Sequence, residues 1–437
     1  MILLTVFFCI VLLIVLISWG KINPFLSFLI VSIIAGLLLG IPVNKIATSI
    51  QKGIGDTVGS LLIIIVLGAM LGKLVAESGA AQKIASVLMK SFGTKNMQWA
   101  LVATGFIVGI PLFYQVGFVL LIPLIFSVVY QYKLPAVYIG LPTLAALSVT
   151  HGFLPPHPAP TALVGQFNAN LGQTLVYGLL IAIPAIIIGG PLFSKTLKKI
   201  KSNPLETFQP TEIKEDRLPG TFASFLVTLF PVALLMITTL LMYFNFQNEF
   251  FVQTINFLNT PAIVMLLAVG VATYYIGVKT GKSIKEIMSI YEAAVKDIAM
   301  ILLIVGAAGA LKQILAESGV DKVIGEQLQT LHLHPLVLGW LIAAIIRACL
   351  GSATIAGLTA AGILAPLIVQ TGVNPNLMVL SVGAGSLAFS HVNDTAFWMF
   401  KEYFNLSLKD TFRSWSAMET IVAFCGLMGV LLLDLIV

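Results

Sequence analysis

Apolar runs long enough to cross a lipid bilayer recur from one end of the chain to the other, with short polar loops between them. A transmembrane helix needs about 20 apolar residues to span a hydrocarbon core of about 30 Å. Runs of this length predict full crossings at residues 2–19, 23–41, 56–77, 172–194, 219–244, 260–279, 297–317 and 415–436. The pattern therefore predicts an all-α polytopic membrane protein.

Two longer apolar stretches, residues 97–130 and 335–371, do not fit simple crossings. Each is too long for one helix and too short for two crossings with a turn, and each is interrupted at its middle, at residues 109–111 and 351–354. Non-helical backbone at membrane depth has to be surrounded by protein. We expect both stretches to form re-entrant hairpins that enter and leave on one side of the membrane.

Two other stretches, residues 135–166 and 375–404, have the length of single crossings but contain breaks. The first break, at residues 151–157, includes two consecutive prolines, and proline removes a backbone donor and disfavours helix in the residue before it. The second break, at residues 390–394, is polar. We expect two broken transmembrane helices, which gives about ten full crossings and two hairpins in all.

The chain also contains an internal duplication. The residues Ala-Glu-Ser-Gly at 76–79 recur at 316–319, each time at the end of a long apolar run, and His151 has a counterpart in His391 at the same offset. Duplicated halves with matched, interrupted segments are typical of secondary transporters, whose substrate sites lie where these segments meet.

The distribution of basic residues predicts the orientation of the chain. With both termini outside, 18 of the 24 lysines and arginines fall in inner loops and three in outer loops, as the positive-inside rule requires. The helix at 56–77 then runs inwards and its counterpart at 297–317 runs outwards. We therefore predict two inverted-topology repeats, with one hairpin opening to each side of the membrane.

Composition agrees with a protein of the lipid bilayer, because 58% of the residues are hydrophobic and only 10% are charged. The formal charge of +6 comes from loops rather than from one face, so we expect no nucleic-acid partner. The predicted organisation is N-terminal helices at 1–55, repeat 1 at 56–194, a cytoplasmic loop at 195–218, linking helices at 219–280 and repeat 2 at 281–437.

Polar residues near the breaks are the candidates for substrate binding. Arg347 is the only arginine within an apolar segment, and a buried guanidinium needs a partner. A substrate carboxylate would be a good bidentate partner, and the alternative is an internal pair with Asp394 or a backbone carbonyl. We predict a substrate site formed by Arg347, Gly351, Ser352, Ala353, Thr354 and Asn393 together with His151, Tyr114 and Gln115.

Asp394 is the leading candidate for a proton site, since the pattern places it near the midplane and places Glu419 and the other carboxylates near segment ends. A desolvated carboxylate can load and release a proton. The structural alternative for Asp394 is a cap of the second half-helix. His391 and His157 also lie at breaks and are further proton-coupling candidates. We expect Lys312 to be structural, with its ammonium reaching an interface.

No metal or other cofactor is predicted. The three cysteines are scattered in apolar segments, and the spacing of His151 and His157 matches no common metal motif. A membrane metalloenzyme and a channel are the alternatives to a transporter. Two inverted halves around a midplane site favour transport over both, so we predict that the protein is not an enzyme.

The residues at these breaks resemble the gluconate permease family. The resemblance covers nearly the whole chain and rests on four motifs, Gly109 to Gly117, Thr150 to Pro158, Gly351 to Thr354 and His391 to Asp394 followed by Phe397 and Trp398. The string His-Gly-Phe-Leu-Pro-Pro-His-Pro within the second motif is highly specific.

The resemblance implies a function and a location. Members of this family are bacterial inner-membrane proton symporters for gluconate and related sugar acids, and some carry D-serine. The family is placed in the ion transporter superfamily, whose known folds have inverted repeats with re-entrant hairpins, and analogy with it favours a homodimer. The family pattern usually has an acidic residue where this chain has Gln115, so the substrate preference or a proton site is expected to differ.

Overall fold

The computed structural model is mainly helical in the part of the chain that it describes, which comprises residues 2–109, 114–155, 157–209, 213, 218–242, 248–320, 323 and 333–437. Within these ranges there is no β-strand. Seven of the described helices are long and apolar enough to cross a membrane. These observations confirm an all-α polytopic membrane protein.

The first half of the chain supplies eight α-helices and a helical extension. The helices are α1 (Ile2–Ser18), α2 (Pro24–Leu38), α3 (Val43–Glu77), α4 (Ala80–Gly109), α5 (Tyr114–Tyr132), α6 (Ala136–Phe153), α7 (Pro158–Gln166) and α8 (Leu171–Ile187). A π turn, η1 (Ile188–Leu192), and a 3-10 turn, η2 (Lys195–Leu197), continue α8. A short 3-10 turn, η3 (Glu206–Phe208), lies in the polar loop that follows.

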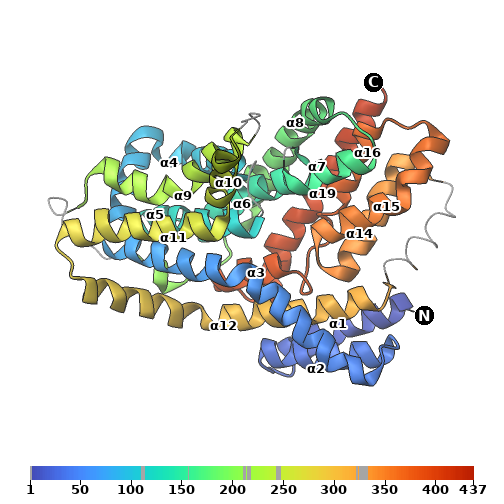
Figure 1. The fold of residues 1–437 in the computed structure, drawn as a ribbon, viewed down its shortest axis with the longest axis horizontal. Coiled ribbons are helices and arrows are strands. Elements are labelled where there is room, and N and C mark those ends of the chain that lie inside the picture. The colour runs from blue at the N-terminus through green and yellow to red at the C-terminus, as the bar shows by residue number, and fades with distance from the viewer. Residues whose placement is uncertain are drawn as a thin grey trace.

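The remaining described helices begin with α9 and end with α19. They are α9 (Thr221–Leu241), α10 (Glu249–Leu258), α11 (Pro261–Ala272) with its extensions η5 (Thr273–Gly277) and η6 (Val278–Thr280), α12 (Ile284–Glu317), α14 (Pro335–Leu350), α15 (Ala353–Thr371), α16 (Pro375–Gly385), α17 (Thr395–Tyr403), α18 (Leu408–Thr411), η7 (Phe412–Ser416) and α19 (Ala417–Asp434). Figure 1 shows α14, α15, α16 and α19 grouped on one side of the molecule and α4, α5, α9 and α11 on the other.

The two longest helices begin earlier than hydropathy predicts. Helix α3 starts at Val43 rather than residue 56, and α12 starts at Ile284 rather than residue 297. Both N-terminal parts are polar, which is why they read as loops, but each buries an apolar stripe such as Ile287 and Ile290. A capping box formed by Ser283 and Glu286 also fixes the start of α12.

Helix α4 also begins before the predicted hairpin, at Ala80 instead of residue 97. Its backbone is interrupted at Gly93, where φ is 64°. Glycine adopts this left-handed conformation without steric strain, so the interruption separates an amphipathic part from the apolar part that leads towards the first predicted tip. Residues 110–113 of that tip lie outside the described part of the chain.

Helices α3 and α12 pack against each other in antiparallel fashion along one side of the molecule (Figure 1). Ser49, near the start of α3, donates to Glu317 at the end of α12, whereas Lys73, near the end of α3, pairs with Asp297 at 2.8 Å. At their crossing a Cβ on Gly309 would lie 2.5 Å from the carbonyl oxygen of Gly53. The two duplicated helices are thus in close backbone contact and point in opposite directions.

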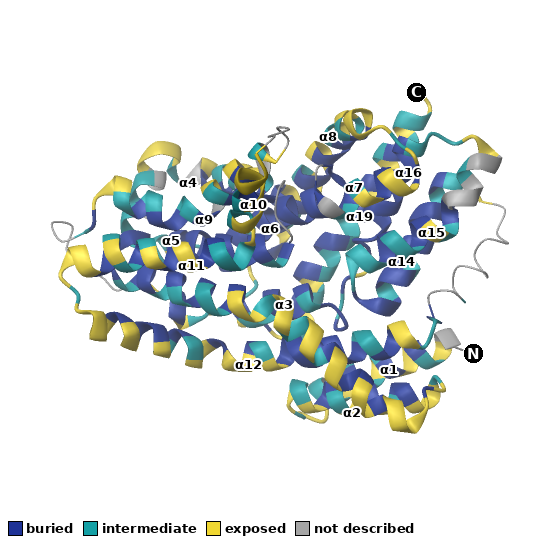
Figure 2. Cartoon of the chain, in the orientation of Figure 1, coloured by how far each residue is buried: buried dark blue, intermediate teal, exposed yellow. Residues whose placement is uncertain are grey.

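The breaks in the second half lie where the sequence predicts them. Helix α14 ends at Leu350 and α15 begins at Ala353, and the two helices pack against each other. Helix α16 ends at Gly385 and α17 begins at Thr395. In the first half, the prolines after His151 separate α6 from α7. The C-terminal residues of α6, α14 and α16 at these breaks, Phe153, Leu350 and Gly385, are buried, and Figure 2 shows buried residues through the middle of the molecule.

Candidate functional site

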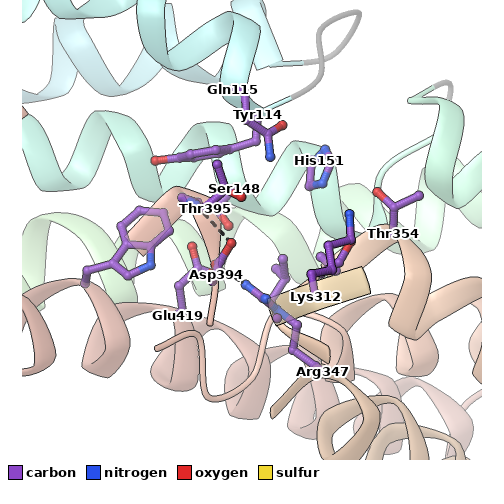
Figure 3. Close-up of a pocket in the computed structure, with 16 residues that line it drawn as sticks. Tyr114, Gln115, Ser148, His151, Lys312, Arg347, Thr354, Asp394, Thr395 and Glu419 are labelled. Carbon is purple, nitrogen blue, oxygen red and sulfur yellow. Dashed lines mark hydrogen bonds and ion pairs between the residues drawn. The ribbon is translucent and has the colours of Figure 1, made fainter. Parts of the chain in front are cut away.

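A small cavity of about 70 Å³ lies where the ends of the broken helices meet, and its volume is below the ~300–1,000 Å³ range of small-molecule sites. Figure 3 shows polar side chains from both halves of the chain facing it. The lining residues are Tyr114, Gln115, Ser148, His151, Lys312, Arg347, Gly351, Ser352, Ala353, Thr354, Leu387, Asp394, Thr395, Ala396, Trp415 and Glu419.

The end of α14 positions the arginine of this cavity. Gly351 has φ 69° and its N–H donates to the carbonyl of Arg347 at 2.9 Å, which closes the helix one turn after the arginine. A Cβ on Gly351 would lie 2.1 Å from the carbonyl oxygen of Asn393. The Asn393 amide donates to the carbonyls of Ala348 and Cys349 at 2.8 and 3.0 Å. This contact joins the break after α14 to the break before α17.

Asp394 is held in place by three donors. Its carboxylate pairs with Arg347 and accepts from the Ser390 hydroxyl, and its second oxygen accepts from the backbone N–H of Ala396 at 2.9 Å, which caps α17. The Trp415 indole donates to Ser390 at 2.7 Å and extends the network. Both structural alternatives for Asp394, a partner of Arg347 and a helix cap, are therefore present.

Arg347 keeps part of its donor capacity. Its side chain is only 4% exposed, yet within the described residues Nε and Nη1 have no hydrogen-bond partner. A buried, unsatisfied donor costs about 1–3 kcal/mol, and more when the group is charged. The internal pair with Asp394 thus leaves two guanidinium nitrogens without an acceptor among the described residues, in a side chain that also lines the cavity.

The first half of the chain supplies the opposite wall. Tyr114 from α5 is buried, its ring lies 5.3 Å from that of Trp415, and its hydroxyl has no hydrogen-bond partner in the described part of the chain. Ser148 and His151 come from α6, and Gln115 lies next to Tyr114. The wall carries hydroxyl, amide and imidazole groups in apolar surroundings, which suits a hydroxylated ligand.

His151 and His157 form a hydrogen-bonded pair, and their contacts indicate which nitrogen of each ring carries the proton. Nδ1 of His157 accepts from the backbone N–H of Ala159 at 3.3 Å, and Nε2 of His157 lies 3.1 Å from Nδ1 of His151. If His157 accepts at Nδ1, its neutral ring carries the proton on Nε2 and donates to His151. His151 then accepts at Nδ1 and carries its own proton on Nε2. His157 acts behind the cavity wall by orienting His151.

The structure brings most of the predicted site residues together in one cavity. Those that line it are Tyr114, Gln115, His151, Arg347, Gly351, Ser352, Ala353, Thr354 and Asp394. Three others do not line it. Asn393 caps α14, His157 supports His151, and His391 lies in the same break as Asp394.

Two charged residues of the cavity were assigned elsewhere from the sequence. Glu419 was placed at a solvated segment end, but the helix that carries it starts at Leu408 and continues through η7, so Glu419 is 1% exposed. Lys312 was expected at an interface, but it lies against the cavity. Hydropathy cannot place either residue, because it locates a helix end only approximately and does not show which side chain faces inwards.

A second, wider cavity adjoins the first. It shares Gln115, Lys312, Ser352, Thr354 and Thr395 with the inner cavity, and its volume is about 560 Å³. It extends to Asp56 on α3, whose side chain is 65% exposed. The shared residues therefore lie between the inner cavity and the protein surface.

Comparisons with known proteins identify the family of the chain. A family model described as GntP family permease matches residues 1–436. The chain is 45% identical over 429 residues to a high-affinity gluconate transporter of Escherichia coli (98% of each chain covered), and 43% identical over 428 residues to the gluconate permease of Bacillus subtilis (95% of this chain, 96% of the relative). It is also 43% identical to an L-idonate transporter of Escherichia coli, with 97% of each chain covered.

A solved structure of another transporter has a lower sequence identity to this chain. The YdaH transporter of Alcanivorax borkumensis aligns with 95% of this chain and 98% of its own at 17% identity, with a TM-score of 0.43. A likeness this low carries no argument about the fold. The family match and the relatives, which span nearly the full length, show that the protein is a multi-pass transporter of the cell membrane and not an enzyme, and that the chain belongs to the GntP family of permeases.

Proposed function

We propose that this protein imports gluconate or a closely related hydroxylated carboxylate together with a proton. The observation that carries the proposal is the buried Arg347 guanidinium, whose Nε and Nη1 have no acceptor within the described residues and which lines the polar cavity between the broken helices. The names of the relatives support the substrate class, because they include two gluconate transporters and an L-idonate transporter.

The cavity offers a distinct group for each part of a sugar acid. The carboxylate binds the free donors of Arg347, with Lys312 as a second positive charge on the same wall. Ser352, Thr354 and the unpaired Tyr114 hydroxyl are available for the hydroxyl groups of the substrate. Gln115 adds a neutral amide, which can both donate to and accept from a hydroxyl.

Alternating access is proposed to follow from two inverted repeats. The antiparallel packing of α3 and α12 supports the inversion, because these helices end in the duplicated tetrapeptides. The pairs α4–α5 and α14–α15 would be the hairpins of repeats 1 and 2, within the divisions 56–194 and 281–437. The outward-facing route would use the wider cavity that reaches Asp56. Movement of the hairpin-bearing parts against α3 and α12 would then expose the site to each side in turn.

The test is uptake of labelled gluconate by the purified protein in liposomes. We expect an imposed pH gradient, acidic outside, to drive accumulation without sodium, and we expect unlabelled gluconate and idonate to compete more strongly than D-serine. D-serine carries a positive ammonium group, and Asp394, which lines the cavity, is already paired with Arg347. Uptake that ignores the pH gradient and follows sodium would contradict proton coupling, and preferential competition by D-serine would contradict the substrate class.

A further inference from the structure

Glu419 is a buried acid that lies near the Ser148 hydroxyl and forms no ion pair within the described residues. It lies in the first turn of α19 and is 1% exposed, and neither carboxyl oxygen makes a hydrogen bond of good geometry within the described residues. Figure 3 shows it beside the cavity that Arg347 and Asp394 also line. An ionised carboxylate in such surroundings depends on the positive charge of other groups that line the cavity, whereas the neutral acid does not.

The charged and titratable groups around Glu419 come from a few elements. Arg347 on α14, His151 on α6, Tyr114 on α5, Lys312 on α12 and Asp394 at the start of α17 line the same cavity. The other elements that pack on α19 contribute no further charge, because α8, α16 and η1 contain no acidic, basic or histidine residue. The arginine of η7 is exposed.

These groups give the cavity a charge balance that depends on one proton. Arg347 and Lys312 supply two positive charges, and Asp394 and an ionised Glu419 supply two negative ones, so the empty cavity is neutral. Protonation of Glu419 leaves one net positive charge. A substrate carboxylate then restores neutrality, whereas binding it beside an ionised Glu419 would place a net negative charge in a buried site, which is unfavourable.

We propose that Glu419 is the group that carries the coupled proton, so that its carboxyl is protonated when the sugar acid is bound and ionised when the cavity is empty. This inference rests on the proposed function. Asp394 is less suited to the role, because its carboxylate accepts from Arg347, Ser390 and the Ala396 N–H and is stabilised in its ionised form. Asp394 instead holds the arginine.

The first test is proton uptake by the purified full-length protein when gluconate binds, measured in weakly buffered solution with a pH indicator. We expect wild type to take up about one proton per gluconate, and its affinity to fall by about tenfold per pH unit in alkaline solution. Glu419→Gln should bind gluconate without proton uptake and with a pH-independent affinity. Glu292→Gln, which changes an exposed glutamate on α12, should behave as wild type.

The outcomes separate the two proposals. Wild type that does not bind gluconate, or binds it without taking up a proton, contradicts the proposed function and the inference with it. Wild type that takes up a proton while Glu419→Gln takes up the same proton contradicts only the role of Glu419. If Glu419→Gln does not fold, infrared difference spectra of wild type decide the question. Gluconate should produce a protonated carboxyl band that Glu419→Asp shifts, and a band that Glu419→Asp leaves unchanged overturns the assignment.

Discussion

At the scale of single residues, Arg347 has two roles that the structure distinguishes. One nitrogen of its guanidinium pairs with Asp394, and two others have no partner in the described part of the chain. The pair orients the guanidinium, since Asp394 is itself fixed as the cap of α17. The sequence interpretation treated the pair with Asp394 and substrate binding as alternatives. The structure contains the pair, and substrate binding by the remaining nitrogens stays a prediction.

Substitution of Arg347 tests whether its unpaired nitrogens bind the substrate while another nitrogen pairs with Asp394. Arg347→Ala should abolish gluconate binding, and Arg347→Lys should weaken it by about 2–5 kcal/mol, because lysine keeps a charge for Asp394 but lacks the planar fork that binds a carboxylate. Thermal unfolding should show that Arg347→Lys remains folded. Calorimetric titration measures the affinity for gluconate, and thermal unfolding measures the stability. Arg413→Lys, at an exposed position, is the control for both measurements. Unchanged affinity in Arg347→Lys would contradict the role of the free nitrogens.

Most of the candidate site can be predicted from the sequence because polar residues in apolar segments are rare and lie at the breaks. Arg347, Asp394 and His151 stand out for this reason. Glu419 and Lys312 do not, since hydropathy places a helix end only approximately and gives no information about which side chain faces inwards. The division between residues that line the cavity and residues that support it, such as Asn393, is also invisible in one sequence because it depends on contacts between distant breaks.

At the scale of elements, α3 and α12 form an antiparallel pair against which α2, α5 and α11 pack. Their close approach depends on small residues, because a Cβ on Gly309 would lie 2.1 Å from the hydroxyl of Thr57 and 2.5 Å from the carbonyl of Gly53. Transmembrane helices associate through such contacts rather than through a hydrophobic driving force. We expect this crossing to be intolerant of larger side chains.

Gly309→Val should therefore destabilise the protein by about 1–3 kcal/mol or more through overpacking. The matched control is Gly59→Val on α3, where an added Cβ meets no atom within 4 Å, so that the change in helix propensity is the same and the packing clash is absent. Thermal unfolding in detergent compares the two variants. Equal unfolding temperatures of the two variants would show that close packing at the α3–α12 crossing does not contribute to the stability of the protein.

The sequence predicts the positions of the breaks between helices, but it places the starts of α3 and α12 too late. The breaks at 351–352 and after His151 are where proline, glycine and polar residues predict them. The N-terminal parts of α3 and α12 were missed because they are polar on one face, and hydropathy averages over both faces of a helix. The capping box at Ser283 and Glu286 is a local signal that marks the true start of α12.

At the scale of the whole molecule, the basic residues and the antiparallel helices lead to the same orientation. The positive-inside rule places the start of α3 outside and the start of α12 inside, and the contacts of Ser49 with Glu317 and of Lys73 with Asp297 place those two starts at opposite ends of the pair. The proposed inversion of the repeats depends on both arguments.

Labelling from one side of the membrane tests the orientation. Lys52→Cys near the start of α3 and Lys285→Cys near the start of α12 are both exposed positions. A membrane-impermeant maleimide added to intact cells should label Lys52→Cys, and it should label Lys285→Cys only after the membrane is opened. Wild type is the blank, because Cys9 and Cys349 are buried and Cys425 is half-buried. Labelling of both variants from the same side would contradict the inverted repeats.

The account as a whole depends on the cavity between the breaks being the place where the substrate binds. The most direct measurement is a structure of the protein determined with gluconate at acidic pH. We predict density for the sugar acid in the cavity lined by Arg347, His151 and Ser352, with its carboxylate against Nε and Nη1 of Arg347. Gluconate bound elsewhere, with Arg347 still paired only to Asp394, would contradict the account.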